Sequence, residues 1–546
     1  MAELDNAAVA ERLEAFAGLL DLAGAFGYSA RAYRRAAETI RTTEAPILEL
    51  ARQGRAQELR GIGPGIASIL RELVETGEIA RAKELEGEVA PELVGLGRFL
   101  GIGPKRAVEL GRALGVRTAD ELRAAIEAGR VSSVRGFGPK TEAKFREALE
   151  REHETTPRQG LTINRARALV EALADALGGE VAGDPRRWAD VSTRLAVVVP
   201  SSNPDEILDR FASLPLIVSI VDREPRRALG VTVEGVPVEV VAAEPGRFGT
   251  ELVRATGSPE FVASLGELPD AADEESVFRA LDRSFVSPEL REGKWLTATE
   301  SGPPKLVDRA EIRGDLHVHT DWSDGRATVL EMGEAARDLG YDYLAICDHT
   351  QNVRVVPGLD ADDIRRQAEE IEAANQELAP FRILRGSECD ILPDGSLDLP
   401  DDVLLELDWV QASVHAGQRA TRDAMTKRVV EALRHPAVSC LSHPKGRIIN
   451  HRPENELDLE RVFEVMVEEG IAVETNGLPD RLDLRDVHLR LAIDSGVPIV
   501  CSTDAHSVRG LQNMQLAVAT ARRAGASATD VLNTRPLAEL PLGPRR

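Results

Sequence analysis

Seven short apolar runs in the last part of the chain end in or beside a histidine or an acidic residue, and this pattern restricts the possible folds. The runs are DLHVHT, YLAICDHT, RILRGSECDI, WVQASVH, VSCLSHP, IAVETNG and PIVCSTDAH. Continuous apolar runs of this length are typical of buried parallel strands. Helix-like or loop segments separate them, so the pattern predicts a (β/α)7-type barrel over residues 314–535. The carboxyl ends of its strands would meet on one face.

The histidines are concentrated in this region, because only His153 of the ten lies outside residues 317–506. Nine histidine and carboxylate side chains follow the predicted strands: His317, His319, Asp324, His349, Glu388, His415, His443, Asp504 and His506. Burying so many polar groups at one barrel mouth would be costly without a cation. Mixed nitrogen and oxygen ligands favour Zn²⁺, Mn²⁺ or Fe over Ca²⁺ or Mg²⁺. We expect the remaining histidines of the region, His435, His451 and His488, on the surface or on helices.

The four cysteines lie in or at the end of the same apolar runs: Cys347, Cys389, Cys440 and Cys501. We expect small buried residues rather than disulfides or metal ligands. The net charge of −24 argues against a simple nucleic-acid binder. The first part of the chain is nevertheless close to neutral, so local phosphate binding by backbone amides stays possible.

Three similar turns interrupt the first 155 residues, which otherwise show the apolar periodicity of helices. The turns are LRGIGPGIASIL (59–70), FLGIGPKRAVEL (99–110) and VRGFGPKTEAKF (134–145). Each places two glycines around one apolar residue, which permits a tight turn with positive φ. The helix that follows begins with free N–H groups that can bind an anion. Stacked helical hairpins without a ligand are the alternative.

These turns resemble the helix-hairpin-helix motif, which implies a DNA-binding region over residues 1–155. By this resemblance, backbone groups of the turns contact phosphate and nearby basic side chains add to the contacts. The predicted DNA-binding residues are Gly61, Gly63, Gly65, Gly101, Gly103, Lys105, Arg106, Gly136, Gly138 and Lys140.

Residues 160–300 alternate helical and strand-like patterns, which predicts a small α/β domain. EVAGDPRRWADVSTRLAVVV (180–199) resembles the nucleotidyltransferase motif of family X DNA polymerases. GVPVEVVAAEPGRFGTELVRATGS (235–258) resembles the strand and T-G-S turn of that family, and VFRALDRSFVSPELREG (277–293) resembles its end-of-palm segment. With the flanking regions, the resemblance to bacterial members covers nearly the whole chain.

The predicted palm departs from this family at the residues that carry polymerase chemistry. Alignment on the shared glycine places Arg194 and Ala196 at two catalytic aspartate positions and Glu239 at the third. Two-metal phosphoryl transfer needs a cluster of carboxylates, which a cation and a methyl group cannot supply. Asp184 replaces a serine that meets the incoming triphosphate, and its charge would repel that substrate. We expect a degenerate, DNA-facing scaffold; a shifted register using Asp184, Asp190 and Glu239 is the alternative.

The C-terminal runs resemble the PHP (polymerase and histidinol phosphatase) domain through H-x-H, S-D-G, D-H, a lone glutamate, S-V-H, HPKGR and T-D-A-H-S. The resemblance implies three divalent metals, Mn or Zn, with Fe as a further candidate. The first would be bound by His317, His319, Glu388 and Asp504. Glu388 would bridge to a second, completed by His415 and His443, and the third would be bound by Asp324, His349 and His506.

This resemblance also implies hydrolysis of a phosphate ester by a water that the ligand cluster holds, without a nucleophilic serine or cysteine. Lys445 and Arg447 follow a ligand strand and are candidates for contacts with substrate phosphate. Glu474 and Asn476 end the sixth run. They could support the ligands or simply be polar structural residues.

The combination predicts a metal-dependent phosphoesterase that acts on gapped, nicked or damaged DNA in repair, as a 3′–5′ exonuclease, a 3′-phosphatase or an abasic-site endonuclease. The alternatives are an active gap-filling polymerase of family X with a PHP exonuclease, a small-molecule phosphatase of the histidinol phosphate type, and a non-catalytic DNA-binding scaffold. The predicted organisation is a helical region (1–155), a palm and thumb (160–300), a linker (301–313) and the barrel (314–535). We expect a cytoplasmic, nucleoid-associated protein without a membrane span.

Overall fold

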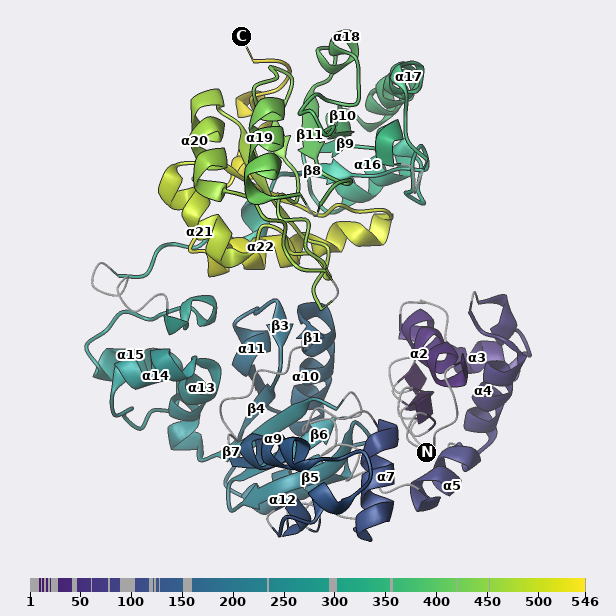
Figure 1. Ribbon diagram of the computed structural model, residues 1–546, viewed down its shortest axis with the longest axis vertical. Helices are drawn as coiled ribbons and strands as arrows, with labels where there is room; N and C mark the ends of the chain where they lie inside the picture. Colours follow the sequence, from purple (N-terminus) through teal and green to yellow (C-terminus); the bar gives the residue numbers. More distant parts are fainter. Residues whose placement is uncertain are drawn as a thin grey trace.

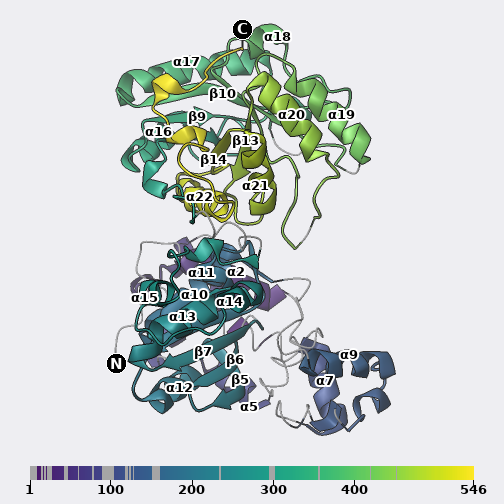
Figure 2. The same cartoon turned by 90° about the vertical axis from the view of Figure 1, so that its left-hand side faces the viewer.

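The computed structural model describes most of the chain. The described residues are 9–10, 12–13, 16–17, 20, 28–41, 47–59, 61–76, 79–88, 104–116, 121, 124–126, 128–150, 160–232, 235–293, 302–353, 357–418, 420–450 and 452–545. They form a helical N-terminal region, a five-stranded domain and a seven-stranded barrel (Figures 1 and 2). Among these residues, no helix is both long and apolar enough to cross a membrane.

The described part of the N-terminal region is helical. Its helices are α2 (Tyr28–Arg41), α3 (Ile47–Arg52), α4 (Pro64–Thr76), α5 (Ala80–Glu88), α7 (Pro104–Leu114) and α9 (Pro139–Glu150), with the 3₁₀ turns η1 (Ala56–Glu58) and η2 (Val131–Ser133). Helices α4, α7 and α9 begin with proline, whose missing N–H costs no hydrogen bond at that position. Ile40, Ile47 and Leu70 pack in one apolar cluster, so α2, α3 and α4 share a small core.

The first and third predicted hairpin turns have the same local structure. Gly61 and Gly136 both have a φ of 92°, a conformation that residues with a side chain rarely adopt. The apolar residue that follows, Ile62 or Phe137, is buried. Helices α4 and α9 each begin two residues further on, so both turns lead directly into a helix N-terminus.

The middle domain, which we call the palm, is a mixed sheet in the order β2-β4-β7-β6-β5 with only the β4–β7 pair parallel. Its strands are β2 (Glu180–Ala182), β4 (Leu195–Pro200), β5 (Ile217–Glu224), β6 (Arg227–Thr232) and β7 (Pro237–Ala243), beside a small ribbon of β1 (Leu161–Thr162) and β3 (Val191–Ser192). Side chains alternate along β4. Leu195 and Val197 pack toward α10 (Ile163–Leu177) and α12 (Pro204–Ser213), whereas Ala196 packs toward α13 (Phe248–Thr256).

Short helices complete the palm, and most of them follow its last strand. They are α11 (Gly183–Arg186) within the sheet connections, then η3 (Pro245–Arg247), α14 (Pro259–Leu265), α15 (Glu274–Ala280) and η4 (Pro288–Leu290). Phe261, Phe278 and Leu290 form the apolar core of this last part. The predicted alternation of helices and strands is therefore observed.

The last domain is a barrel of seven parallel strands, as the apolar runs predicted. The strands lie in sequence order, and a bridge between Val318 and Ala505 joins the first strand to the segment after the last. They are β8 (Gly314–Val318), β9 (Tyr343–Ile346), β10 (Arg382–Asp390), β11 (Trp409–Ser413), β12 (Cys440–Leu441), β13 (Ala472–Asn476) and β14 (Ile499–Ser502). The helices are α16 (Val329–Asp338), α17 (Ala361–Leu378), α18 (Asp401–Leu404), α19 (Arg422–Leu433), α20 (Leu459–Glu469), α21 (Asp486–Ser495) and α22 (Met514–Arg523).

Residues on both sides of the predicted limits of the barrel pack against it. Apolar side chains from all seven strands meet in one cluster that includes Leu540, which lies beyond residue 535. The Arg545 guanidinium donates to the carbonyl of His435 at 2.8 Å. In the predicted linker, the Val307 N–H donates to the Ala526 carbonyl at 2.9 Å. Residues 536–545 and the described part of the linker therefore pack as parts of the barrel.

All four cysteines are free and buried, which confirms that they are buried residues outside disulfides. Burial raises the pKa of the Cys347, Cys389, Cys440 and Cys501 thiols. The thiols are therefore protonated packing groups at neutral pH.

The palm and the barrel contact each other through the loop that follows β12. Arg447 Nη1 donates to Asp190 Oδ2 of the palm at 2.7 Å, and Asn450 Nδ2 donates to the Gly160 carbonyl at 2.8 Å. Ile449 packs in an apolar cluster with Ile163 of the palm. From α22, Arg523 Nη1 also donates to the Arg187 carbonyl at 2.7 Å and contacts Glu292 at 3.2 Å. This interface combines buried apolar and charged contacts.

Candidate metal centre

The nine predicted ligands meet at the carboxyl end of the barrel, because each follows or ends a parallel strand. By strand, they are His317, His319 and Asp324 at and after β8, His349 after β9, Glu388 in β10, His415 after β11, His443 after β12, and Asp504 and His506 after β14. Three overlapping groups of these side chains are close enough to hold metal ions.

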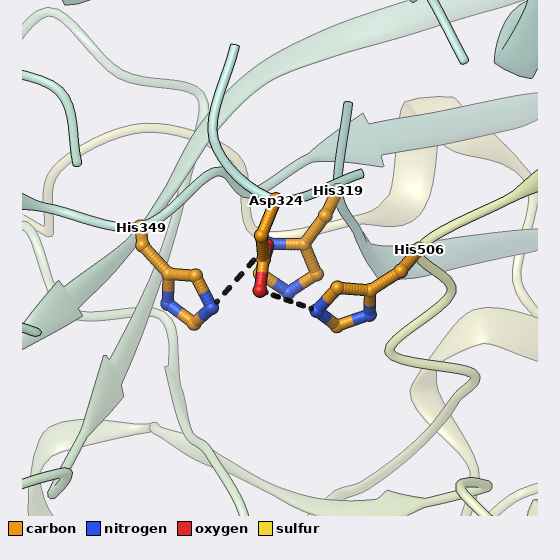
Figure 3. A group of neighbouring side chains, drawn as sticks. All are labelled: His319, Asp324, His349 and His506. Atoms are coloured by element: carbon orange, nitrogen blue, oxygen red, sulfur yellow. Dashed lines mark ion pairs between the residues drawn. The ribbon is translucent and has the colours of Figure 1, made fainter. Parts of the chain in front are cut away.

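The first group contains His319, Asp324, His349 and His506 (Figure 3). His506 Nε2 lies 3.2 Å from Asp324 Oδ2, and His349 Nε2 lies 3.7 Å from Asp324 Oδ1. The three imidazoles thus surround one carboxylate, from segments that follow three different strands.

The other two groups share members with the first. One contains His317, His319 and Asp504, in which His319 Nε2 lies 3.0 Å from Asp504 Oδ1. The last contains His349, Glu388 and His415, and His443 Nε2 lies 2.7 Å from Glu388 Oε1. His319 and His349 each fall in two groups, whereas the resemblance gave each of them one metal. Glu388 falls in one group, and its carboxylate also lies 3.5 Å from His317 Nε2.

The donor atoms suit transition-metal binding. Six buried atoms in this cluster lack a well-aligned hydrogen-bond partner among the described residues, although they lie close to one another: His317 Nε2, both ring nitrogens of His319, His349 Nδ1 and both carboxylate oxygens of Glu388. Buried polar atoms are normally hydrogen-bonded, so atoms like these point to a missing ligand. Imidazole and carboxylate donors together fit Zn²⁺, Mn²⁺ or Fe.

Electrostatics also favour a cation in this cluster. Burial alone would raise the pKa of Glu388, but the facing His415 and His349 imidazoles outweigh it and hold that pKa well below its ordinary value. Burial would lower the pKa of His415 and His506, but the carboxylates raise both to about 9. Protonated imidazoles thus compensate the ionised carboxylates in the metal-free site, and a divalent cation can supply the same positive charge when it displaces these protons.

The cluster is buried on one side and open on the other. His317, His319 and Glu388 are at most 1% exposed, whereas the side chains of Asp324 and His506 are 23% and 32% exposed. A substrate can therefore reach the centre from the side of Asp324 and His506.

Two predicted ligands have unusual backbone conformations. His443 has a φ of 24° and Asp504 has a φ of 52°, which are rare for residues other than glycine. Such conformations persist where surrounding contacts impose them, and they concentrate at functional sites. Here both residues follow a strand and turn into the cluster.

Glu474 and Asn476 support the ligands from behind. Glu474 Oε1 accepts from His317 Nδ1 at 2.6 Å, and Oε2 accepts from the His443 N–H at 2.7 Å. Asn476 Nδ2 donates to Asp504 Oδ2 at 2.8 Å. These contacts favour the supporting role over ordinary structural polarity, because they leave His317 Nε2 directed into the cluster.

The sequence interpretation missed further acidic residues that support the site. Asp390 Oδ1 lies 3.1 Å from His415 Nδ1, and Asp315 Oδ1 accepts from the His317 N–H at 3.2 Å. Asp348 accepts from the Thr320 hydroxyl at 2.6 Å and from Gln367. Their position in the sequence could have identified them, because Asp315, Asp348 and Asp390 each lie one or two residues from a predicted ligand.

Arg447 has a different role from the one expected of it. Its guanidinium donates to the carbonyls of Arg481 and Leu482 and to Asp190, at 2.7, 2.8 and 2.7 Å. These bonds hold it at the palm interface, which argues against the predicted phosphate contact. Lys445 is buried beside it, and its N–H donates to Asp483 Oδ1 at 3.3 Å.

The remaining histidines lie off the cluster. His435 follows α19 and lies 3.5 Å from Asp401, and His488 is in α21, 3.6 Å from Glu454. Burial lowers the pKa of His488 to about 4. His153 and His451 lie outside the described residues.

Only some of the predicted DNA-binding residues lie in the part of the chain that the structure describes. Gly61, Gly63, Gly65, Gly136, Gly138 and Lys140 lie in the two described hairpin turns or the helices after them. Gly101 and Gly103, and the side chain of Lys105, lie outside the described residues. Arg106 Nη2 donates to the Gly136 carbonyl at 2.7 Å, and the guanidinium lies 4.6 Å from the centre of the Phe137 ring. Arg106 therefore ties α7 to the third hairpin turn.

At the palm, the structure pairs the residues that occupy the polymerase positions. Arg194 Nη2 lies 3.0 Å from Glu239 Oε1, and Ala196 is 4% exposed beside Glu239 in the register of β4 and β7. Asp184 Oδ1 lies 2.5 Å from Arg187 Nη2. Each acidic group at this place thus has an arginine partner.

Comparisons with known proteins agree with this architecture. A helix-hairpin-helix domain model matches residues 4–79, and a PHP domain model matches residues 315–477. The DNA polymerase/3′-5′ exonuclease PolX of Bacillus subtilis (strain 168) is 33% identical over 558 aligned residues, which cover 97% of each chain. A probable phosphatase of Acetivibrio thermocellus is 31% identical over 201 residues, 35% of this chain and 78% of that protein. A probable phosphatase of Photobacterium profundum is 26% identical over 218 residues, 37% and 81% of the two chains.

The barrel and its cluster of histidines and carboxylates define a hydrolase of the PHP class. The chain as a whole belongs to the PolX family, the family X DNA polymerases that carry helix-hairpin-helix and PHP domains.

Proposed function

We propose that this protein is a metal-dependent phosphoesterase that processes DNA ends or damaged DNA in repair, and that the barrel contains its working active site. The observation that carries the proposal is the convergence of nine candidate ligand side chains at the barrel mouth, in a chain that also has a helix-hairpin-helix domain. The PolX relative is named as a 3′-5′ exonuclease, which supports that polarity. Gapped, nicked or damaged DNA in the nucleoid is the expected substrate.

The nine side chains would hold three divalent ions, Mn or Zn with Fe as a further candidate. We assign His317, His319, Glu388 and Asp504 to the first ion, Glu388, His415 and His443 to the second, and Asp324, His349 and His506 to the third. Bound divalent ions lower the pKa of water and neutralise phosphate oxygens. The protein's own contribution is to orient the donors and to exclude water from the buried side of the cluster.

Glu474 and Asp390 would act through two of these histidines. Glu474 lies 2.6 Å from His317 Nδ1, so the proton of that ring stays on Nδ1 and Nε2 keeps a lone pair for a cation. Asp390 does the same for His415 at 3.1 Å. No serine or cysteine nucleophile is needed, and the four buried thiols are not in a reactive state.

We also propose that polymerase activity has been lost. Arg194 and Ala196 stand where two metal-binding carboxylates are required, and Glu239 is ion-paired with Arg194 at 3.0 Å. In the palm's described residues, no group of three or more ligands is close enough to hold a metal ion. Asp184 is paired with Arg187, so neither group is available for a triphosphate.

The geometry argues equally against the shifted register. Asp184, Asp190 and Glu239 would have to share metal ions, but each binds a different arginine: Arg187, Arg447 and Arg194, respectively. Because Arg447 belongs to the barrel, moving Asp190 toward a metal would break the domain interface.

Labelled gapped DNA incubated with Mn²⁺-loaded protein, with and without deoxynucleoside triphosphates, tests both proposals. Shortening without extension is the expected result. Template-dependent extension would overturn the loss of polymerase activity. Turnover of a small phosphate ester without any action on DNA would instead favour a small-molecule phosphatase; a barrel relative is named as a probable phosphatase.

The variant His317→Ala tests whether the barrel cluster is the active site. The variant should lose DNA hydrolysis and keep DNA binding, because the hairpins lie in another domain. Hydrolysis that survives in the folded variant would refute the assignment of the barrel cluster.

A further inference from the structure

Four arginines surround the place where a family X polymerase would carry its catalytic carboxylates. They are Arg194, Arg227, Arg247 and Arg254, which we call the palm arginine cluster. Two glutamates link them. Glu239 contacts Arg194 at 3.0 Å and Arg227 at 3.4 Å. Glu251 contacts Arg254 at 2.5 Å, Arg227 at 3.4 Å and Arg247 at 3.9 Å.

The cluster is built from separate elements of the palm. Arg194 directly precedes β4, Arg227 begins β6, Arg247 ends η3 and Arg254 is in α13. Their shared partners, Glu239 in β7 and Glu251 in α13, connect the sheet to the helix that covers it. The position of the four guanidinium groups is therefore set by the fold and not by one mobile loop.

The positive groups lie outermost. The arginine side chains are 38% to 43% exposed, whereas Glu239 and Glu251 are 18% and 13% exposed. A third carboxylate, Asp270, lies at the rim, 3.2 Å from Arg247, and is 62% exposed. The inner carboxylates hold the guanidinium groups in place, and the arginine side chains are more exposed than these two glutamates.

The ion pairs engage only some of the guanidinium nitrogens of the palm arginine cluster. A guanidinium has five N–H donors in a planar fork. The ion pairs engage one nitrogen each on Arg194 and Arg254, and two each on Arg227 and Arg247. Guanidinium groups with outward-facing donors match the oxygens of phosphate in both charge and geometry.

We propose that the palm arginine cluster binds the phosphate backbone of DNA without a metal ion. The four guanidinium groups outnumber the three carboxylates that contact them, so the groups in contact have a net positive charge that favours an anion over a metal ion. In this chain the polymerase metal site has thus become an anion site, although the protein as a whole has a net charge of −24. The proposal rests on the proposed function in naming DNA as the ligand.

Binding of labelled gapped DNA to the full-length protein, measured by fluorescence anisotropy in EDTA, tests this proposal. EDTA removes the contribution of divalent ions, so binding is measured whether or not the barrel hydrolyses DNA. The test variant is the double substitution Arg194→Gln and Arg254→Gln. The control is Arg223→Gln, at an arginine of the same sheet that is 39% exposed and pairs with Asp205 and Asp209.

The double variant should bind DNA about tenfold more weakly at low salt, and the slope of log K against log salt should fall by about one for each lost phosphate contact. The control should bind like the unmodified protein. The double variant Arg194→Lys and Arg254→Lys should regain most of the affinity, because it restores the charge. Circular dichroism verifies that each variant is folded.

An unchanged affinity and salt slope in the folded glutamine variant would overturn the proposal and make the cluster a purely structural ion-pair network. An equal loss in Arg223→Gln would overturn it too, because the effect would then be one of general charge. Failure of the proposed function has a different signature, which is a lack of DNA hydrolysis by the Mn²⁺-loaded protein with DNA binding by the cluster intact.

Discussion

Glu474 lies behind the ligand cluster and holds two of its members in place. It is fully buried and accepts from His317 Nδ1, the His443 N–H, and the hydroxyls of Ser442 and Ser502. Burial would raise the pKa of Glu474, but the facing His317 outweighs it and lowers that pKa. A charged carboxylate at this position orients the imidazole and raises its basicity toward a cation.

Glu474→Gln should therefore weaken metal binding and DNA hydrolysis by about 10- to 100-fold, because the neutral amide cannot accept all of these bonds. Metal content after dialysis and the rate of DNA hydrolysis measure the two effects. Glu464→Gln is the control, since Glu464 is 61% exposed and pairs with Arg461 on the surface of α20. Metal content and rate within twofold of the unmodified protein would remove Glu474 from the site.

The four buried cysteines should be unreactive in the folded protein. Because burial raises the pKa of all four thiols, the thiolate fraction is suppressed at and above neutral pH. Ellman's reagent at pH 8 should not react with the native protein and should detect four thiols after unfolding. Rapid reaction of any thiol in the native state would show that its strand opens.

At the level of elements, the hairpin turns depend on glycine conformation. Gly61 and Gly136 both have a φ of 92°, and the apolar residue after each is buried between helices. The turn leads directly into the N-terminus of α4 or α9, where free N–H groups are able to bind an anion such as phosphate. The sequence register of the turns and their backbone geometry therefore agree.

Gly136→Val should lower DNA affinity severalfold and destabilise the hairpin by about 1–2 kcal/mol, because a side chain strains this left-handed conformation. Anisotropy with gapped DNA and thermal unfolding measure the two effects. Gly266→Val imposes a similar strain, at a φ of 74° with open space around it, away from the hairpins. The control variant should lose stability without losing DNA affinity, and an equal loss of affinity in both variants would contradict the role of the turn.

At the scale of the whole molecule, the loop after β12 joins the candidate centre to the palm. It begins at His443, continues through Arg447, which binds Asp190, and reaches Asn450, which binds the Gly160 carbonyl. The palm therefore stabilises the conformation of a segment that carries a predicted ligand. This explains how a palm without polymerase chemistry would still contribute to the barrel.

Asp190→Asn should reduce the unfolding free energy by about 1.5–3 kcal/mol, the usual contribution of a hydrogen bond between charged groups. Urea denaturation measures this change. Asp205→Asn is the control, because Asp205 is 78% exposed and its pair with Arg223 should contribute less than about 1 kcal/mol. Equal stability of Asp190→Asn and the unmodified protein would show that the ion pair does not hold the interface.

The same pair has a defined pH dependence. Burial would raise the pKa of Asp190, but Arg447 outweighs it, so the folded pKa lies below the ordinary value of 3.8. Its contribution is complete above that value and is lost as the pH falls through the lower folded pKa. Acid titration of stability should therefore show a smaller loss below pH 3.8 in Asp190→Asn than in the unmodified protein. Identical acid titrations would contradict this sign.

Periodic features of the sequence predicted the fold well. The seven apolar runs became seven parallel strands, because continuous apolar segments must be buried on both faces. The predicted ligands lie close together for the same reason, since parallel strands bring their carboxyl ends together. The short strand β12, with only Cys440 and Leu441, was still marked by its flanking motif.

The sequence alone determined the residue types at the barrel mouth, the hairpin turns and the absence of aspartates at Arg194 and Ala196. Only the tertiary structure decided which partner each charged group takes. Arg447 binds Asp190 across the palm interface, and Glu474 binds His317 across the barrel. The reason is physical: motifs and periodicity describe neighbours along the chain, whereas the energy of a buried charge depends on partners that folding brings from distant segments.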